Sequence, residues 1–432
     1  MKRIVACAAL AAIMIGFSSC GKVLYVESLK DPDTPEEKIP DGNNDENPED
    51  NPRKELTLAA SSQAILQHTN AFAFQFLSRI NASVEGDYIV SPLSVQFLLG
   101  MLLNGAQGKT ADEICQVLGY GAGEVDAVNE FARSMMEQLP ALDKKTKLNI
   151  ANAIVVNQRF PIKDAFKADV VKYYDAEVSN KDFLDPATVD AINQWASDHT
   201  NGLIQKVLDS LNAADLAILM NALYFKGSWM APFAKDNTTR EKFRKESGET
   251  AEVDMMKKYN TSLGYREGDG FRAVSLPYGN GAYSMVILLP DTGKKPADVI
   301  AALDTLDWPD FLKTLYHRPV NLWFPKFKTG TTVVLNDLLS EMGMPLAFTE
   351  FADLKALSDY ALCLTSVKQD AVIIVDEEGT EAAAVTIGMV GTTSVPPQPI
   401  DFRADRPFLY LITESDTGTI LFAGKFGGKE LQ

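Results

Sequence analysis

Apolar side chains recur at helical spacing in several stretches of the chain. A stripe with a four-residue interval predicts a first helix, formed by His68, Phe72, Phe76 and Ile80. A second helix is expected to begin at Ser91 and Pro92, since a hydroxyl caps the first turn and proline fits it, and to end near 105–108. Further start signals predict helices from Thr110, as a capping box, and from Asp185 to about residue 202.

Three other stretches have the pattern of strands. Residues 215–225 are apolar without alternation, which is typical of a strand covered on both faces. Asn221 lies in the middle of this stretch, so its amide needs hydrogen-bond partners inside the core. Residues 282–290 and 320–327 are further strands. The mixture predicts an α+β fold, with a large sheet and helices around it.

The first twenty residues have the pattern of an export signal. Lys2 and Arg3 precede fourteen mostly apolar residues, 4–17, and then a short run of small residues ending in Cys20. A helix of fourteen residues is about 21 Å long, which is short for a membrane span. We expect segment 1–20 to stay outside the core. It resembles a bacterial lipoprotein signal with Cys20 as the acylated residue; ordinary cleavage with an incidental cysteine is the alternative.

An acidic segment follows the signal. Nine carboxylates and one lysine lie between residues 31 and 50, a net charge of 1 − 9 = −8 out of −17 for the whole chain. Such a composition predicts a disordered linker over residues 21–55, followed by one large domain over 56–432. The acidity disfavours nucleic acid as a partner. Beyond the signal only Cys115 and Cys363 remain, and we expect each to fill a core position.

An enzyme is disfavoured by the absence of catalytic motifs. The sequence has three histidines, and it contains no Gly-x-Ser-x-Gly, His-Glu-x-x-His or Cys-x-x-Cys motif. His68 and His199 fall on helical stripes, which favours packed side chains. The glycines of residues 119–124 follow a helix, whereas a phosphate-binding loop follows a strand. We therefore expect no catalytic residues, no cofactor and no metal.

Five segments together resemble the signature segments of the serpin family, in the family's order. They are YIVSPLSVQFLLGMLLNGAQGKTADEI at 88–114, INQWASDHTNGLI at 192–204, NALYFKGSW at 221–229, DEEGTEAAA at 376–384 and RPFLYLI at 406–412. The resemblance implies about three β-sheets and nine helices, with an exposed reactive loop near residues 380–398. In inhibitory serpins a target protease cleaves this loop, whose upstream half then inserts as a strand into the largest sheet.

The resemblance also assigns roles to individual residues. The loop hinge comprises Glu377, Glu378, Gly379, Thr380, Glu381, Ala382, Ala383 and Ala384. The region where the sheet opens comprises Ser91, Ser94, Asn221, Trp229 and Gln369, with glutamine at a position where the family commonly has histidine. Family spacing places the cleaved bond between Thr393 and Ser394. Because the following stretch is about three residues longer than usual, Met389, Val390 and Thr392 are alternative cleavage points.

The loop's own sequence is compatible with insertion. Alternate residues from Thr380 to Val390 share one face of a strand, and none of them is charged. The resemblance thus predicts a monomeric inhibitor that forms a covalent 1:1 complex with an elastase-like or subtilisin-like serine protease, or alternatively with a cysteine protease. A non-inhibitory serpin acting as a binding module is the rival interpretation. We expect a lipid-anchored protein of a bacterial cell envelope, on the outer membrane or cell surface, or otherwise a periplasmic or secreted protein; the lipid would be its only membrane contact.

Overall fold

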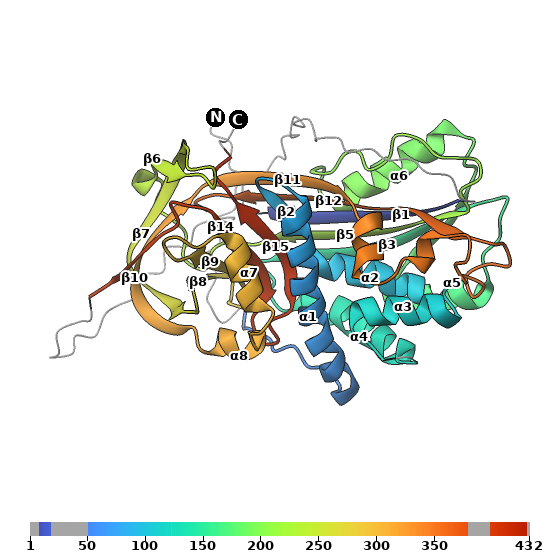
Figure 1. Cartoon of the computed structure of the whole chain (residues 1–432), viewed down its shortest axis with the longest axis horizontal. Coiled ribbons are helices and arrows are strands. Elements are labelled where there is room, and N and C mark those ends of the chain that lie inside the picture. Colours follow the sequence, from blue (N-terminus) through green and yellow to red (C-terminus); the bar gives the residue numbers. More distant parts are fainter. Residues whose placement is uncertain (1–7, 19–50, 122, 379–397, 430–432) are drawn as a thin grey trace.

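The structure, a computed structural model, describes residues 8–18, 51–121, 123–378 and 398–429 (Figure 1). The largest sheet has six strands. In spatial order they are β11 (Phe327–Val334), β12 (Cys363–Val375), β1 (Ala8–Ser18), β5 (Ala217–Lys226), β3 (Lys147–Asn157) and β4 (Glu177–Lys181). All neighbours in this sheet are antiparallel except β3 and β4.

The remaining strands form a second path that divides at one long strand, β7 (Thr250–Glu267). Strand β6 (Thr239–Arg244) pairs with residues 250–255 of β7, and β10 (Tyr316–Pro325) pairs with residues 255–265. Strand β10 also pairs in parallel with β13 (Ile400–Arg403). The other end of β7 pairs with β8 and so leads into a second group of strands. That group is β8 (Phe271–Tyr278), β9 (Tyr283–Pro290), β14 (Phe408–Glu414), β15 (Ile420–Phe426) and β2 (Tyr88–Val90). With the six-stranded sheet, these groups are the three sheets that the family resemblance implies.

Nine α-helices occur in the described residues, as expected. They are α1 (Ala60–Ser83), α2 (Pro92–Leu103), α3 (Gly108–Leu118), α4 (Val125–Gln138), α5 (Asp164–Tyr174), α6 (Pro186–His199), α7 (Pro296–Leu303), α8 (Trp308–Lys313) and α9 (Asn336–Met342). Helices α2 to α5 lie below the main sheet in Figure 1, and α6 lies above it. The caps predicted for α2 and α6 are present: the Ser91 hydroxyl accepts from the backbone N–H of Ser94, and the Asp185 carboxylate accepts from that of Ala187.

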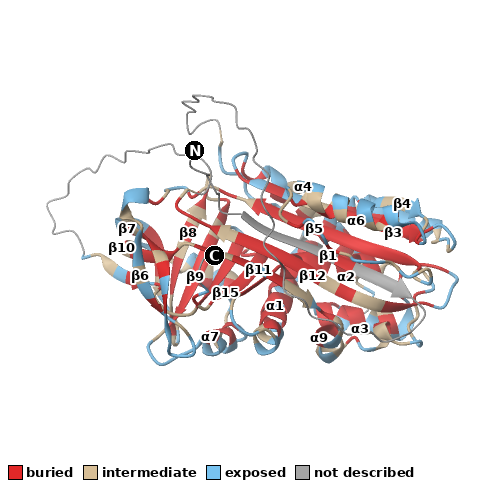
Figure 2. Ribbon diagram, turned by 90° about the horizontal axis from the view of Figure 1, so that it is seen from above, coloured by how far each residue is buried: buried red, intermediate tan, exposed pale blue. Residues whose placement is uncertain are grey.

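Two hydrophobic clusters hold these layers together. The larger lies among α1 to α5, the main sheet and the strands around β15, and the smaller lies between α6 and the other face of the main sheet. Strand β5 contacts both, and nine of its ten residues are buried, which confirms the prediction of a strand covered on two faces (Figure 2). Cys115 and Cys363 are buried, in keeping with core positions.

One expectation about the N-terminus is wrong. The apolar part of the export signal was expected to stay outside the core, and instead Ala8–Ser18 forms strand β1 in the middle of the main sheet. The physical reason is that two neighbouring strands, β5 and β12, both offer backbone groups to it, and an uncharged segment can enter such a position without burying a charge.

A second expectation, the capping box at Thr110, is also wrong. Helix α3 begins two residues earlier, after Gln107, so Thr110 lies within its first turn. The side chains of the two expected cap residues instead accept hydrogen bonds from backbone N–H groups that are distant in sequence. The Thr110 hydroxyl accepts from the backbone N–H of Asp353, and the Glu113 carboxylate accepts from that of Leu346.

Candidate functional site

A buried polar network joins the start of α2 to the middle of the main sheet. On one side, the Gln369 amide of β12 forms two bonds with the backbone of Ser91. It accepts from the Ser91 N–H at 3.2 Å and donates to the Ser91 carbonyl at 3.0 Å. The Ser91 hydroxyl in turn donates to the carbonyl of Leu421 in β15 at 2.7 Å. Gln369 thus both donates and accepts, as its amide permits.

The second side of the network runs through Asn221 of β5. The Ser94 hydroxyl donates to the Asn221 amide oxygen, and the Asn221 amide nitrogen donates to the side-chain oxygen of Asn152 at 2.7 Å. Asn152, which lies opposite Asn221 on β3, donates to the carbonyl of Tyr174 at the end of α5 at 2.7 Å. The buried Asn221 amide therefore has the partners that the sequence requires, and each partner is itself buried.

Strand β1 lies between the two sides of this network. Ile13 of β1 is opposite both Gln369 of β12 and Asn221 of β5. The two residues therefore face each other across one inserted strand, and each is held by the N-terminal turn of α2. Strand β1 thus passes between residues that the family resemblance assigns to sheet opening.

A second group of contacts fixes the end of β12, where the chain leaves the sheet towards residue 379. The Trp229 indole N–H donates to the Asp376 carbonyl at 2.9 Å, and the backbone N–H of Phe233 donates to the Glu377 carbonyl at 2.8 Å. The Glu377 carboxylate forms an ion pair with Lys326 at 2.9 Å and accepts from the Thr238 hydroxyl at 2.8 Å. We call Trp229, Thr238, Lys326 and Glu377 the hinge clamp.

Burial and charge act in opposite directions on the carboxylates of this segment. Asp376 is 3% exposed, and this burial raises its pKa from 3.8 to about 6. Burial also opposes ionisation of Glu377, but the hydrogen bonds from Lys326, from its own backbone and from Thr238 together lower the pKa of that carboxyl. Ionised Glu377 is therefore part of the clamp, whereas ionised Asp376 is a cost to it.

Sequence reasoning found part of this site and missed part. It identified Ser91, Ser94, Asn221, Trp229 and Gln369, and the structure places the first three and Gln369 in one network and Trp229 in the clamp. It missed Asn152, Thr238 and Lys326. A polar residue within the apolar run 150–156 was a signal for Asn152, while Thr238 and Lys326 gave none, because their partner Glu377 is distant in sequence.

Other predicted residues lie outside the described part of the chain. Of the hinge, Glu377 and Glu378 are described and residues 379–384 are not. The predicted cleavage points between 389 and 394, and Cys20, are also outside it. The Glu378 carboxylate forms an ion pair with Lys235, so the described part of the hinge is anchored on both of its glutamates.

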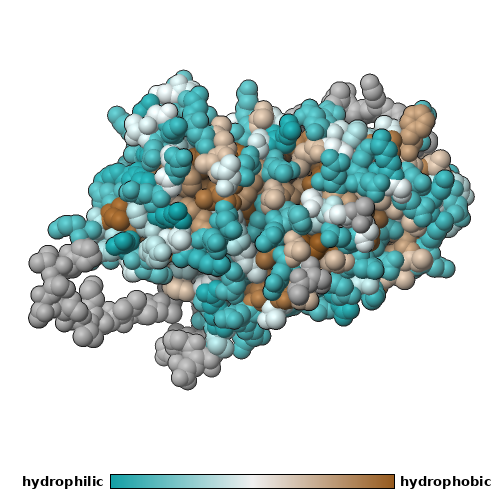
Figure 3. All heavy atoms as spheres, turned by 60° about the horizontal axis from the view of Figure 1, so that its bottom comes forward, coloured by the Kyte–Doolittle hydropathy of each residue, from teal (hydrophilic) through white to brown (hydrophobic). Residues whose placement is uncertain are grey.

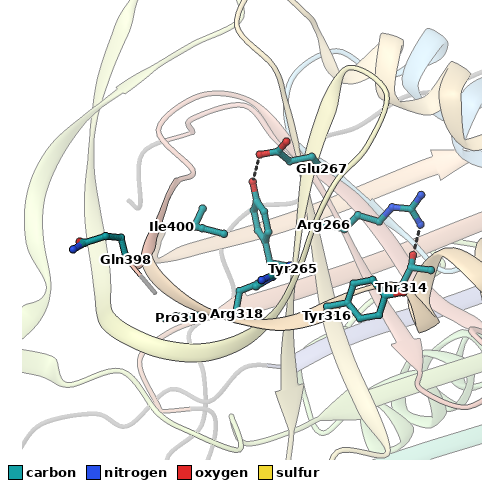
Figure 4. Close-up of a pocket in the computed structure, with 9 residues that line it drawn as sticks. All are labelled: Tyr265, Arg266, Glu267, Thr314, Tyr316, Arg318, Pro319, Gln398 and Ile400. Atoms are coloured by element: carbon teal, nitrogen blue, oxygen red, sulfur yellow. Dashed lines mark hydrogen bonds between the residues drawn. The ribbon is translucent and has the colours of Figure 1, made fainter. Parts of the chain in front are cut away.

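A cavity of about 580 Å³ lies where the chain returns to the fold after residue 397 (Figure 4). Its walls come from β7, β10, Thr314 at the end of α8, and the residues Gln398 and Ile400. The Tyr265 hydroxyl donates to Glu267 at 3.1 Å, and the Arg266 guanidinium donates to Thr314. These polar groups are paired with one another, so the cavity shows no convergent set of catalytic groups.

Two of the three histidines, His68 and His199, pack against aromatic rings as the sequence indicates, and His317 is exposed. His68 lies edge-on to Tyr120, and the His199 ring lies 4.3 Å from that of Trp195 and bonds the Trp195 carbonyl through Nδ1 at 2.9 Å. Within the described ranges, no group of three or more His, Cys, Asp or Glu residues is arranged to hold a metal ion.

The surface carries dispersed apolar side chains. Figure 3 shows one face, on which hydrophilic residues predominate and apolar ones are interspersed. The most exposed large apolar residues are Phe351, Tyr316 and Leu184, which lie on different parts of the fold. No helix among the residues that the structure describes has both the length and the apolar character to cross a membrane.

Comparison with known proteins identifies the family. The family model "Serpin (serine protease inhibitor)" matches residues 67–427. Iripin-2 of Ixodes ricinus is 31% identical over 86% of this chain and 95% of its own length, and a serine protease inhibitor of Cyanea capillata is 31% identical over 85% and 98%. The crystal structure of the thermophilic serpin tengpin in the native state superposes with a TM-score of 0.73 at 27% identity, covering 88% of this chain and 97% of tengpin. The chain therefore belongs to the serpin family.

Proposed function

We propose that this serpin inhibits a protease as a suicide substrate. The observation that carries the proposal is that the main sheet holds an eleven-residue strand, β1, between β5 and β12, although neither neighbour adjoins it in sequence. The sheet therefore has a position for an added strand beside β12. Residues 379–397 follow β12 after only three residues in the sequence, which supports their upstream half as the strand that is added there.

The chemistry belongs to the target protease. Its nucleophile attacks the carbonyl carbon of Thr393, the bond to Ser394 breaks, and the new amino group of Ser394 leaves with the C-terminal fragment. Thr393 then remains joined to the protease as an acyl ester. Insertion of the loop carries the protease away and distorts its active site, so water does not complete the reaction.

The energetics make insertion sensitive to charge. Each residue of an added strand gains up to two hydrogen bonds of about 1 kcal/mol, against about 1 to 2 kcal/mol for ordering it. The net free energy from the backbone is therefore close to zero, so burial of side chains and relief of strain must drive insertion. A buried unpaired charge costs several kcal/mol, about enough to prevent insertion. The uncharged alternate residues from Thr380 to Val390 meet this requirement.

The loop sequence also suggests the target. No lysine or arginine occurs between Lys368 and Arg403, which disfavours trypsin-like proteases. Thr393 suits a protease that accepts small or β-branched residues, such as an elastase-like or subtilisin-like serine protease. Mass spectrometry of the C-terminal peptide released by such proteases tests the site; peptides that all begin outside 390–395 would refute it.

The test of the mechanism uses protein recovered after export. Ala384→Asp or Thr380→Arg should convert the inhibitor into a substrate, so that the SDS-resistant adduct with the protease is lost and cleavage continues. Ala384→Ser is the matched control, because it changes the same position without adding a charge, and the adduct should be retained. An adduct at wild-type yield with Ala384→Asp would contradict the insertion argument.

Heat distinguishes the inhibitor from a non-inhibitory binding module. An inhibitor that stores conformational energy should become markedly more heat-stable after its loop is cut, because the cut loop completes the sheet. A binding module should change little. Unfolding curves of intact and cleaved protein therefore separate the two functions.

We further propose that Cys20 is acylated and anchors the protein in a bacterial cell envelope. The small residues before Cys20 and the acidic segment after it support this location. Metabolic labelling with a radioactive fatty acid should mark the wild type and not Cys20→Ser. Equal labelling of both would refute the anchor.

A further inference from the structure

Strand β1 is bound on both edges within the main sheet. Residues 8–16 are paired with β5 and with β12 at every position, and 17 and 18 continue along β12 after a small irregularity. Met14 is 7% exposed and packs in the cluster beneath α6. The segment therefore occupies a complete strand position, which we call the β5–β12 slot.

The segment in the slot resembles part of the reactive loop in sequence. Residues 11–17 read Ala-Ala-Ile-Met-Ile-Gly-Phe, and residues 383–389 read Ala-Ala-Val-Thr-Ile-Gly-Met. Four of the seven positions are identical, and Ile–Val and Phe–Met are similar apolar pairs.

The loop has access to the same slot through its connection to β12. Strand β12 ends at Val375, and the loop sequence begins a few residues later, so a short turn would suffice to lay the loop antiparallel beside β12. The loop and the leader are therefore alternative occupants of the slot.

We infer that the leader segment 8–18 blocks the β5–β12 slot, so that a chain that retains its leader is not an inhibitor until this segment leaves the sheet. The inference rests on the proposed function, since the block concerns loop insertion. The ligand of the slot is an extended, uncharged peptide segment of the chain itself. Two segments cannot pair with the same edges at once, so occupancy by one excludes the other.

The test uses the whole, unprocessed chain. Ala12 lies opposite Ala222 of β5, so cysteines at these two positions, in a background in which Cys7 and Cys20 are serine, should form a disulfide that locks the leader in the slot. A cysteine at Ile4, outside β1, is the control partner for Ala222 and should not cross-link. Peptide mapping of the folded chain measures both disulfides.

The yield of the covalent adduct with the protease then measures whether the leader blocks loop insertion. The locked chain should give no SDS-resistant adduct with an elastase-like or subtilisin-like protease. Ile13→Asp introduces a charge at the β1 position that pairs with Gln369 of β12 and Asn221 of β5, both buried. It should expel the leader and raise the adduct yield about tenfold over the unprocessed wild type. Ile4→Asp adds the same charge outside the strand and should change nothing.

The outcomes separate the two proposals. A locked chain that forms adducts as well as Ile13→Asp, or a chain that forms no 12–222 disulfide, overturns the blocked slot and leaves the proposed function standing. If exported wild-type protein forms no adduct with any protease, the proposed function fails and the block fails with it, whereas the disulfide still shows where the leader lies.

Discussion

Replacing Asp376 by asparagine should stabilise the protein at neutral pH. The carboxylate is 3% exposed at the end of β12, and burial raises its pKa from 3.8 to about 6. Since one pKa unit corresponds to about 1.4 kcal/mol, holding the ionised form in the fold costs about 3 kcal/mol. Asparagine keeps the oxygen that accepts from the backbone N–H of Glu378 at 3.0 Å, and it removes the charge.

The sign of the pH dependence follows from the raised pKa. Folding favours the protonated carboxyl, so the contribution of Asp376 to stability is complete below about 3.8 and is lost as the pH rises through about 6. The free energy of unfolding of Asp376→Asn should therefore exceed that of the wild type by about 3 kcal/mol at pH 7, and the difference should approach zero near pH 4.

Urea unfolding of both proteins at several pH values between 4 and 7.5 measures this difference. Asp236→Asn is the control, because Asp236 is an exposed carboxylate in the nearby turn Lys235–Asn237. It should change stability little at any pH. A difference between Asp376→Asn and the wild type that does not vary with pH, or a destabilised variant at pH 7, would refute the reasoning.

Three further predictions concern the network and the hinge clamp. Asn221→Ala leaves two buried partners without a hydrogen bond, so the free energy of unfolding should fall by about 2 to 4 kcal/mol in urea, whereas exposed Asn149→Ala on β3 should change it little. In a double-mutant cycle, Lys326→Met and Glu377→Gln should show a coupling free energy of about 1 to 2 kcal/mol at pH 7. The coupling should disappear in acid, when the Glu377 carboxyl, whose pKa is lowered, becomes protonated. Additive effects at pH 7 would contradict the clamp. Gln369→His should be made in the Asp376→Asn background, so that Asp376 does not titrate. The inhibition rate of this double variant should change with pH around 6.5, whereas Asp376→Asn alone, which keeps Gln369, should show no change there.

Local signals predicted a large part of the fold. The cap of α2 at Ser91 and the two-sided burial of β5 were readable because each depends on residues close together in sequence. The Thr110 capping box failed for the opposite reason, since Thr110 and its neighbour Glu113 bond to backbone groups more than 200 residues away. A local sequence pattern does not show which distant backbone groups will bond to these side chains.

In the site, too, some residues were predictable from the local sequence and others depend on distant partners. Asn221 was recognisable as a polar residue inside an apolar run, and its need for partners followed directly. Lys326 was indistinguishable from a surface lysine, because its role depends on Glu377 being brought beside it by the sheet. The segment 8–18 is the clearest case. Its small apolar residues suit an export signal and a sheet strand equally, and its strand pairing depends on β5 and β12, which are distant in sequence.

The pairing of β2 with β15 has a consequence for biosynthesis. Val90, near the beginning of the domain, lies opposite Ala423, and the Tyr88 carbonyl accepts from the Tyr410 hydroxyl across 322 residues. A ribosome must therefore release almost the entire polypeptide before this pairing can close. Folding dominated by such distant pairings is slow, so the pairing of β2 with β15 should be a late step in the folding of a newly made chain.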